Sequence, residues 1–426
     1  MGAITTAKFG KISAQGKFGR MAGAFGRALA RSTSIYWKRV EIVMALTLKA
    51  IRGRILDADS HEMIPNVFWG ETFGPRGAAF ASSVETLFAE SARRRGNQQP
   101  EMPTGDIEAI TPENVWEIKG YSAPSAIDIN RREDVLDEMG IRRALIFPGM
   151  GIFAWVEAHG GGFTGFPIAT PERQRIAHEA LEAFTDWAAA NANDRLRIPG
   201  LLVASKPGMT PELLAKEAEG LIKRGFKVLH IGTGEPPAGV GPADPSMDRF
   251  YSILTEANVS LVTHPPAGMN VMSAAWNKAA PMLCFQGQVH MAESNFVANM
   301  VLGGVFERHP TLRFGAIECG ADWIGPLAER LDIRLDLEGG VMPTKLGMKP
   351  SEYINRNVRV SALGHEPVER WLERYPEVQD TYCFSTDFPH PEGAKHSLDK
   401  MFGRVSPLGD AVIEKFFFRN AELLMP

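Results

Sequence analysis

From about residue 50 to the C-terminus, short apolar runs alternate with longer stretches in which apolar residues recur every three or four positions. Most of the short runs are continuous rather than alternating, which is typical of parallel strands buried on both faces. They predict eight strands, at 54–59, 143–148, 197–203, 226–231, 259–263, 313–318, 358–361 and 382–386. Parallel strands need a long crossover between them, and that crossover is usually a helix.

The intervening stretches carry the start and stop signals of helices. Thr170-Pro171 and Thr210-Pro211 are typical helix starts, and Gly140 and Gly225 are typical stops. Helices are predicted at 130–139, 171–191, 210–224, 245–257, 286–309, 323–337, 366–374 and 411–424. Eight strands that are each followed by helical chain predict an α/β fold of the (β/α)8, TIM-type barrel class.

Two connections are much longer than such a barrel requires. One joins the first two predicted strands and contains Trp69 and Trp116, and the other is the Gly-rich, aromatic segment 149–167. Both follow the carboxyl ends of strands, where barrel active sites are built, so we expect them to cap the pocket. The glycines at 160–162 do not form a phosphate loop, because no Lys-Ser/Thr pair follows them.

Composition and charge exclude several classes of protein. The 426 residues carry a net charge of −4, which argues against a dedicated nucleic-acid binder. There is no apolar run long enough to span a membrane. Three widely spaced cysteines suit a reducing compartment better than a disulfide framework. We therefore expect a cytoplasmic protein with a small-molecule substrate and no nucleic-acid or membrane partner.

The N-terminal segment differs from the rest of the chain. Residues 1–43 contain eight basic residues and a single acidic one, Glu41, among many Gly, Ala and Ser. Two interpretations are open: a disordered basic arm, or an over-called start upstream of a natural first residue at Met44. In either case residues 44–426 are predicted to form a single barrel domain.

Candidate metal ligands follow the first predicted strand, in Asp57-Ala58-Asp59-Ser60-His61. The alternation of an extended chain places Asp57, Asp59 and His61 on one side. Three ionisable groups in a barrel mouth are costly unless a cation neutralises them. An Asp-x-His pair on its own is nevertheless more often a capped turn beside an incidental histidine.

The ends of three other strands favour a metal site over that explanation. His264 follows the fifth strand, Glu318 ends the sixth and Asp387 follows the eighth. The carboxyl ends of the strands converge in a barrel, so these side chains should meet Asp59 and His61. Carboxylate and imidazole together suit one divalent ion, with zinc as the first choice and manganese or iron as alternatives.

At this point the sequence resembles the amidohydrolase superfamily, in the branch related to aminocarboxymuconate-semialdehyde decarboxylase. The resemblance extends from about residue 54 to the C-terminus. It rests on an ordered set of segments: RILDADSHE, INRREDVLDEMGIRRALIFPG, ANDRLRIPG, GFKVLHIGT, LVTHPPAG, VFERHPTLRFGAIECGADWIGPLAERLD and CFSTDFPHPEG.

The resemblance implies a barrel enzyme and roles for particular residues. Asp59 and His61 match the family's metal-binding His-x-His pair, with a carboxylate in place of the first histidine. His264 matches the metal ligand of the fifth strand, and Asp387 matches the ligand of the eighth strand that also handles protons. Glu318 stands where the family usually has a histidine that polarises substrate or water. An ionised carboxylate cannot donate a hydrogen bond to an oxyanion, so Glu318 is predicted to be a ligand or a general base.

Further histidines have weaker predicted roles. His230, near the end of the fourth strand, could contact the metal, bind a second metal or form a pocket wall. His390, His159 and Asp57 are candidates for contacts behind the ligands or with substrate. In members with two metals a carboxylated lysine bridges them, but here Lys227 and His230 should face opposite sides of their strand.

The resemblance implies a small carboxylated aromatic, or a ring-cleavage product, as the substrate. Two chemistries fit, namely hydrolysis by a metal-activated water and non-oxidative decarboxylation. An oxygen-using iron enzyme on the same barrel and a non-catalytic partner subunit remain alternatives. We also expect a homo-oligomer, in the first place a dimer.

Overall fold

The computed structural model describes residues 46–426 except 95–105, 107, 161–167, 266–286 and 342–344. The predicted N-terminal arm, Met44 and most of the glycine run at 160–162 lie outside the described residues. None of the helices in the described part is long and apolar enough to cross a membrane.

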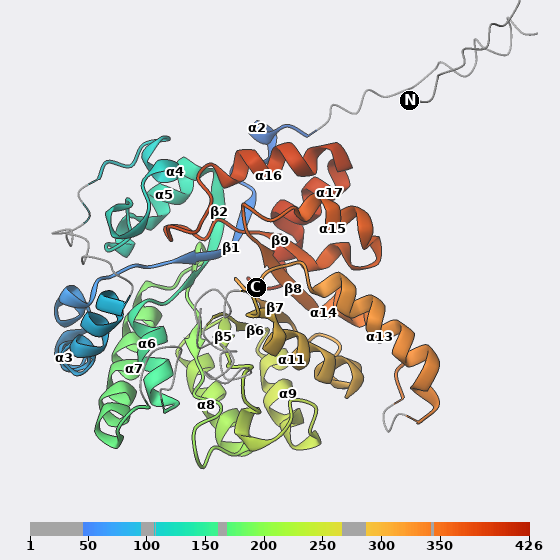
Figure 1. Cartoon of the computed structure of the whole chain (residues 1–426), viewed down its shortest axis with the longest axis horizontal. Coiled ribbons are helices and arrows are strands. Elements are labelled where there is room, and N and C mark those ends of the chain that lie inside the picture. Colours follow the sequence, from blue (N-terminus) through green and yellow to red (C-terminus); the bar gives the residue numbers. More distant parts are fainter. Residues whose placement is uncertain (1–45, 95–105, 107, 161–167, 266–286, 342–344) are drawn as a thin grey trace, which may run out of the picture. The chain divides into compact units, whose positions relative to one another are not determined.

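The described chain is an α/β structure with parallel strands in two sheets (Figure 1). The first sheet has the order β1-β2-β3 and the second the order β4-β5-β6-β7-β8-β9, with every named pair parallel. The strands are β1 (Ile55–His61), β2 (Ile141–Phe147), β3 (Leu196–Arg197), β4 (Gly200–Leu201), β5 (Val228–His230), β6 (Ser260–Thr263), β7 (Phe314–Ala316), β8 (Val358–Ala362) and β9 (Tyr382–Phe384).

Each of the eight predicted strands has a counterpart, but the third is interrupted. The predicted run 197–203 consists of β3 and β4, separated by Ile198 and Pro199. Proline has no N–H to donate to a neighbouring strand, so the ladder breaks there. Within the described residues, neighbouring strands are parallel and follow the order expected for a barrel. Their hydrogen-bond ladders make two separate sheets and do not close into a complete barrel.

The first and last strands nevertheless meet at their carboxyl ends. The Asp387 N–H donates to the Asp59 carbonyl at 2.9 Å, and the His61 N–H donates to the Phe388 carbonyl at 2.7 Å. Ser60 and Phe388 form a parallel bridge. Two of the predicted metal-binding segments are thereby held side by side.

Helices follow or precede the strands, and several coincide with the predicted ones. They are α2 (Leu48–Ile51), α3 (Trp69–Arg94), α4 (Asn114–Glu117), α5 (Arg132–Met139), α6 (Met150–Ala158), α7 (Pro171–Asn191), α8 (Pro211–Lys223), α9 (Asp248–Glu256), α11 (His290–Leu302), α12 (Val305–Arg308), α13 (Ile324–Glu338), α14 (Pro350–Asn357), α15 (Val368–Arg374), α16 (Ser397–Val405), α17 (Asp410–Glu414) and α18 (Asn420–Glu422). Thr170 and Thr210 cap α7 and α8 as predicted, each accepting a backbone N–H through its hydroxyl.

Two predicted helices are less regular than expected. The helix predicted at 286–309 ends at Leu302 and resumes as α12, because Gly303 and Gly304 intervene and Gly304 adopts a φ of 72°. The helix predicted at 411–424 contains a π-helical turn at Lys415–Arg419 between α17 and α18. The π turn carries three buried phenylalanines, 416 to 418.

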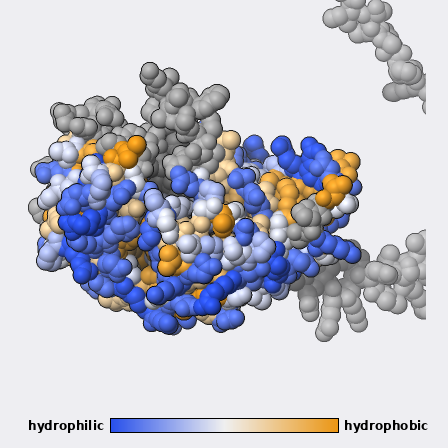
Figure 2. Space-filling view, turned by 90° about the horizontal axis from the view of Figure 1, so that it is seen from below, coloured by the Kyte–Doolittle hydropathy of each residue, from blue (hydrophilic) through white to orange (hydrophobic). Residues whose placement is uncertain are grey.

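The two long connections contain helices that the pattern did not predict. The first includes α3 and α4, which precede α5, the helix predicted at 130–139, and the segment after β2 begins with α6, which packs with α7. Figure 2 shows that hydrophilic residues cover most of the face in view, with separate apolar patches. The exposed large apolar side chains include Ile333, Leu337 and Val341, on and just beyond α13.

Candidate metal centre

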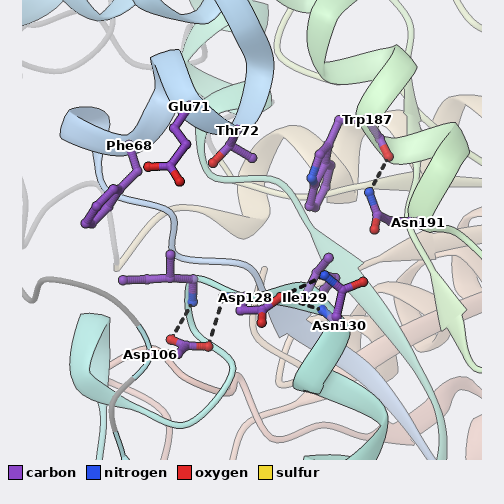
Figure 3. A pocket seen from close by; sticks show the side chains of 10 residues that line it. Phe68, Glu71, Thr72, Asp106, Asp128, Ile129, Asn130, Trp187 and Asn191 are labelled. Carbon is purple, nitrogen blue, oxygen red and sulfur yellow. Dashed lines mark hydrogen bonds between the residues drawn. The ribbon is translucent and has the colours of Figure 1, made fainter.

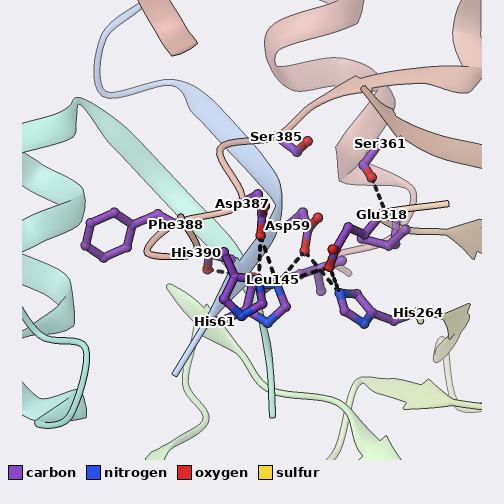
Figure 4. A network of polar contacts seen from close by, with 12 residues as sticks. Asp59, His61, Leu145, His264, Glu318, Ser361, Ser385, Asp387, Phe388 and His390 are labelled. Atoms are coloured by element: carbon purple, nitrogen blue, oxygen red, sulfur yellow. Dashed lines mark hydrogen bonds and ion pairs between the residues drawn. The ribbon is translucent and has the colours of Figure 1, made fainter. Parts of the chain in front are cut away.

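Four segments bring the predicted ligands together at the carboxyl ends of the strands (Figure 4). Asp59 and His61 lie on β1 itself, which continues two residues beyond the predicted end. His264 follows β6, Glu318 lies two residues after β7, and Asp387 lies three residues after β9. The parallel register of consecutive strands explains why these ends lie at one edge.

The side chains lie within contact distance of one another. His61 Nε2 is 3.2 Å from Asp387 Oδ1, 3.3 Å from Asp59 Oδ1 and 3.5 Å from Glu318 Oε2. His264 Nε2 is 2.7 Å from Glu318 Oε2 and 3.6 Å from Asp59 Oδ1. Asp59 and Asp387 are wholly buried, whereas the Glu318 side chain is 17% exposed. The cluster therefore opens towards solvent on the Glu318 side.

The donor set fits a divalent ion. The ligand atoms of Asp59, His61, His264 and Glu318 lie within 4.8 Å of one another, as do those of His61, Glu318, Asp387 and His390. Among the residues that the structure describes, these buried atoms lack a normal hydrogen bond: both Asp59 oxygens, both Asp387 oxygens, His61 Nε2, His264 Nε2 and Glu318 Oε2. Buried polar atoms normally have hydrogen-bond partners, so a group of potential metal-ligand atoms that point at one another without such partners indicates a cation site. Nitrogen and oxygen donors suit Zn²⁺, Mn²⁺ or Fe²⁺.

The pKa values of the two histidines also indicate that the cluster favours positive charge. Burial alone would lower the pKa of His264, but the charge of Glu318 and contacts with Asp59 raise it to about 9. The pKa of His61 is also raised, against the effect of burial, by contacts with Asp387, Asp59 and Glu318. Three carboxylates thus hold protons on two buried imidazoles, and a metal ion would replace those protons.

Two of the carboxylate residues have backbone conformations that are unusual outside glycine. Glu318 has a φ of 57° and Asp387 a φ of 50°, both in the left-handed region. The Glu318 N–H donates to the Ser361 hydroxyl at 2.8 Å, which fixes the turn after β7 to β8. Strained residues of this kind concentrate at functional sites, because the surrounding structure must hold them.

His390 lies closer to the centre than the sequence indicated. Its Nδ1 is 2.9 Å from Asp387 Oδ1, and its ring stacks on His61 with centroids 3.7 Å apart. The His390 side chain is 24% exposed. It therefore stands at the mouth of the cluster, either as a further ligand or as the group that orients Asp387.

Asp57 does not reach the cluster, although alternation placed it on the same side as Asp59 and His61. Its Oδ1 accepts the N–H of Thr386 at 2.9 Å and that of Asp59 at 3.2 Å. Its Oδ2 accepts the Thr386 hydroxyl. The β1–β2 pairing is irregular between Asp57 and Ser60, which changes the simple alternation. Asp57 instead joins β1 to the segment after β9.

His230 and His159 lie outside both groups of candidate ligands. His230 Nε2 is 3.5 Å from the His264 carbonyl oxygen, and its ring meets Trp155 edge-on at 5.1 Å. His159 Nδ1 lies 2.9 Å from the Trp155 carbonyl oxygen, and its Nε2 accepts the Ser205 N–H. Burial lowers the pKa of His230 to about 3 and that of His159 to about 4. Both are neutral side chains beside the centre, which agrees with the pocket-wall interpretation of His230.

Sequence reasoning missed a buried arginine that supports the first ligand strand. Arg132, on α5, donates through Nη2 to the His61 carbonyl at 2.7 Å and through Nε to the Ser125 hydroxyl at 2.7 Å. Glu293, on α11, is also wholly buried and accepts the Thr233 hydroxyl at 3.0 Å. Neither residue stands at a strand end, so no motif singled it out.

A cavity of about 510 Å³ lies elsewhere, between α3, α7 and residues 127–130 (Figure 3). Phe68 and Trp187 contribute to its wall. Of its three acidic residues, Glu71, Asp106 and Asp128, the two aspartates already accept nearby backbone N–H groups. None of the predicted site residues lines this cavity.

Comparison with known proteins identifies the family and agrees with the fold. Residues 159–425 match the amidohydrolase family Amidohydro_2. An amidohydrolase from Mycobacterium avium subsp. paratuberculosis is 20% identical, with a TM-score of 0.60 over 88% of this chain and 99% of that one. A dihydroxybenzoic acid decarboxylase from Polaromonas with bound manganese is 16% identical, with a TM-score of 0.52 over 87% and 96% of the two chains. A 5-carboxyvanillate decarboxylase from Novosphingobium aromaticivorans, also with manganese, is 16% identical, with a TM-score of 0.53 and the same coverage.

The family match spans more than half of the chain, and it includes His264, Glu318, Asp387 and His390. The structural neighbours share the fold over nearly nine tenths of the chain. The resemblance predicted from the sequence is confirmed: the chain belongs to the amidohydrolase family and superfamily.

Proposed function

We propose that this protein is a metal-dependent enzyme that decarboxylates a small carboxylated aromatic compound. The observation that carries the proposal is the convergence of unsatisfied ligand atoms from Asp59, His61, His264, Glu318 and Asp387. The manganese-containing decarboxylases among the structural neighbours support the choice of reaction and substrate class. They also support manganese as an alternative to zinc for the bound ion. We propose that the strands form a complete (β/α)8 barrel, as expected for this superfamily.

A divalent ion bound by these residues would hold and polarise an oxygen of the substrate. The side chains of the protein must then supply a proton to the ring carbon that loses CO2. Loss of CO2 leaves the bonding electron pair on the ring carbon, and that carbon must then accept a proton. Asp387 and His390 are adjacent titratable side chains at the mouth, with Nδ1 and Oδ1 2.9 Å apart. We infer that this pair holds and transfers the proton.

Hydrolysis of a C–N or C–C bond is the second candidate. Asp387 Oδ2 is buried beside the cluster and has no hydrogen-bond partner in the described part of the chain, so it could accept a proton from an attacking water. The difference between the two reactions is testable, because decarboxylation releases CO2 and hydrolysis incorporates an oxygen atom from water.

The first experiment is elemental analysis of the purified protein, followed by assay with 2,6-dihydroxybenzoate and 5-carboxyvanillate. CO2 release, without incorporation of oxygen from labelled water into the organic product, would support the proposal. Incorporated label would favour hydrolysis, and iron content with oxygen consumption would favour an oxygenase. A metal-free protein with none of these activities would favour a non-catalytic partner subunit.

Variants of the ligands provide the controls. His264→Ala and Asp387→Asn should each abolish turnover while leaving the chain folded, and His264→Ala should also weaken metal binding. His365→Ala and Asp336→Asn change exposed residues outside the cluster and should retain activity. Normal turnover with full metal content in either ligand variant would remove that residue from the site.

A further inference from the structure

Two cationic side chains lie against Phe388, the residue that follows Asp387. The Lys119 Nζ is 5.7 Å from the centre of the Phe388 ring, and the Arg132 guanidinium carbon is 5.2 Å from it. Both residues come from the long connection between β1 and β2. Figure 4 shows Phe388 on the same turn as Asp387 and His390, with its ring projecting away from the cluster. Positive charge is thus placed beside the ligands rather than among them.

The backbone fixes Lys119 at this turn. The N–H of Gly120, the next residue, donates to the Pro389 carbonyl at 2.7 Å. Pro389 lies between Phe388 and His390, so the contact ties Lys119 to the segment that carries the proton-transfer pair. The position of Lys119 does not depend on side-chain contacts alone.

The ammonium of Lys119 is buried without a partner. Its Nζ is inaccessible to solvent and has no hydrogen bond to any residue that the structure describes. Three nearby carboxylates act on it electrostatically, and each has other partners: Asp387 contacts His61 and His390, Asp57 accepts from Thr386, and Glu117 pairs with Lys395 and His396. Burial of an unpaired charge is costly, so such a group is usually paired when the protein performs its function.

Arg132 differs from Lys119 in this respect. Its Nε and Nη2 donate to Ser125 and to the His61 carbonyl, and only Nη1 lacks a partner among the described residues. Arg132 therefore supports the β1 ligand strand, whereas Lys119 makes no polar side-chain contact there. Lys395 gives a useful comparison, because its Nζ lies 2.8 Å from Glu117 at the surface.

The charge of the metal centre explains why a cation is needed. Asp59, Glu318 and Asp387 bring three negative charges to one dication, which leaves an excess of negative charge when the histidines are neutral ligands. A substrate with two anionic groups would be repelled unless the protein supplies positive charge for the group that the metal does not hold.

We propose that Lys119 is a specificity residue that pairs with a second anionic group, a carboxylate, on the aromatic substrate. The inference rests on the proposed function for the position of the first carboxylate at the metal centre. The second carboxylate would lie at the Phe388 turn, beside the reacting group. The site would then prefer aromatic dicarboxylates to monocarboxylates.

The test compares two probes, isophthalate and benzoate, which differ in one carboxylate. Their binding to the metal-loaded full chain is measured by calorimetry. The wild-type chain should bind isophthalate more tightly, by about tenfold to a hundredfold, because a hydrogen bond to a charged group contributes about 1.5–3 kcal/mol. Lys119→Met should abolish that preference, with little change in benzoate affinity. Lys119→Arg should retain part of it.

Lys216→Met is the control, because it removes an exposed lysine on α8 that is not among the groups acting on Lys119, and it should leave the preference unchanged. Lys119→Gln provides a second variant if Lys119→Met does not fold. Metal content, measured for each variant, separates loss of the anion contact from loss of the metal. No preference for isophthalate in the wild type, or the same preference in Lys119→Met, would overturn the inference.

The outcomes also separate this inference from the proposed function. A Lys119-dependent preference for isophthalate in a protein that releases no CO2 would support Lys119 and contradict the decarboxylase proposal. Decarboxylation of an aromatic dicarboxylate with the same KM in wild type and Lys119→Met would support the enzyme and contradict the role of Lys119.

Discussion

Glu318 stands where the resemblance seen in the sequence implies a histidine, so its contacts in the structure decide its role. Its Oε2 lies 2.7 Å from His264 Nε2 and 3.5 Å from His61 Nε2, in a backbone conformation with a φ of 57°. Burial alone would raise the pKa of Glu318, but the neighbouring His264 and His61 lower it well below its usual range. No Arg or Lys pairs with Glu318 among the described residues. The carboxylate is therefore ionised within the cluster, as a ligand or a base requires.

This geometry predicts the effect of changing Glu318. Glu318→Gln should lower turnover by at least about two orders of magnitude, the usual scale for loss of a positioned acid or base. Glu318→His, which restores the family's residue, should keep the metal bound. Steady-state kinetics and elemental analysis of both variants are the measurements. Near-wild-type turnover of Glu318→Gln would reject a catalytic role even though the contact is present.

The sequence could predict these residues because each stands at the end of an apolar strand, where the barrel's topology brings distant segments together. Asp59, His61, His264 and Asp387 were found in this way. Lys119 and Arg132 were not, because they lie in a long connection whose path depends on tertiary contacts such as that between Gly120 and Pro389. His390 was underestimated, since only the turn after Asp387 brings its ring onto His61.

At the scale of elements, the union of β1 with the segment after β9 determines the geometry of the centre. Asp57 holds this union through Thr386 and through the N–H of Asp59, while the Asp387 N–H binds the Asp59 carbonyl. Strand positions were predictable from apolar runs, but the break at Pro199 and the helices of the insertions were not. The breaks depend on single residues, and α3 and α6 lie in stretches rich in glycine and aromatics.

Asp57 provides the prediction at this scale. Asp57→Ala leaves two buried N–H groups without acceptors and should lower the free energy of unfolding by about 1–3 kcal/mol for each. Asp57→Asn keeps an acceptor oxygen and should be milder. Chemical denaturation of the metal-free chains measures both effects. Equal stability of Asp57→Ala and wild type would show that the union does not depend on Asp57.

The stability of Asp57→Asn relative to wild type, measured as a function of pH, tests the direction of the Asp57 pKa shift. Burial raises the pKa of Asp57 from 3.8 to about 7, so the folded chain holds a proton there that the unfolded chain has lost. This group therefore makes the wild type less stable as the pH rises from about 4 to 7. Asp57→Asn lacks the charge, so its stability relative to wild type should increase over that interval. A constant difference would contradict the raised pKa.

For the whole molecule, the described structure begins with a helix that is attached to the rest of the chain. The Leu46 N–H donates to Asp410 Oδ1 at 2.8 Å, and Thr47 caps α2. Because these contacts start after residue 43, a chain shortened to begin at Met44 should retain cooperative unfolding and activity. Calorimetry and turnover of the shortened chain measure this. Loss of cooperative unfolding would show that residues 1–43 belong to the folded domain.

The metal centre should also stabilise the whole molecule, because its candidate ligands come from both sheets. Asp59 and His61 belong to the three-stranded sheet, while His264, Glu318 and Asp387 follow strands of the six-stranded sheet. An ion bound only by the folded chain adds about 2.7 kcal/mol when its free concentration is a hundred times its Kd. Removal of the metal should therefore lower the unfolding temperature, and added Mn²⁺ or Zn²⁺ should restore it.

The pH dependence of this stabilisation follows from the histidines. The pKa of His264 is raised to about 9 in the metal-free chain, so binding must displace a proton there at neutral pH. The metal-induced rise in unfolding temperature should accordingly grow from pH 6 to pH 8. His264→Ala should reduce the rise, and His365→Ala, at an exposed histidine, should not. An unfolding temperature that does not respond to metal, in a protein shown by elemental analysis to bind it, would mean that the ion does not join the two sheets through these residues.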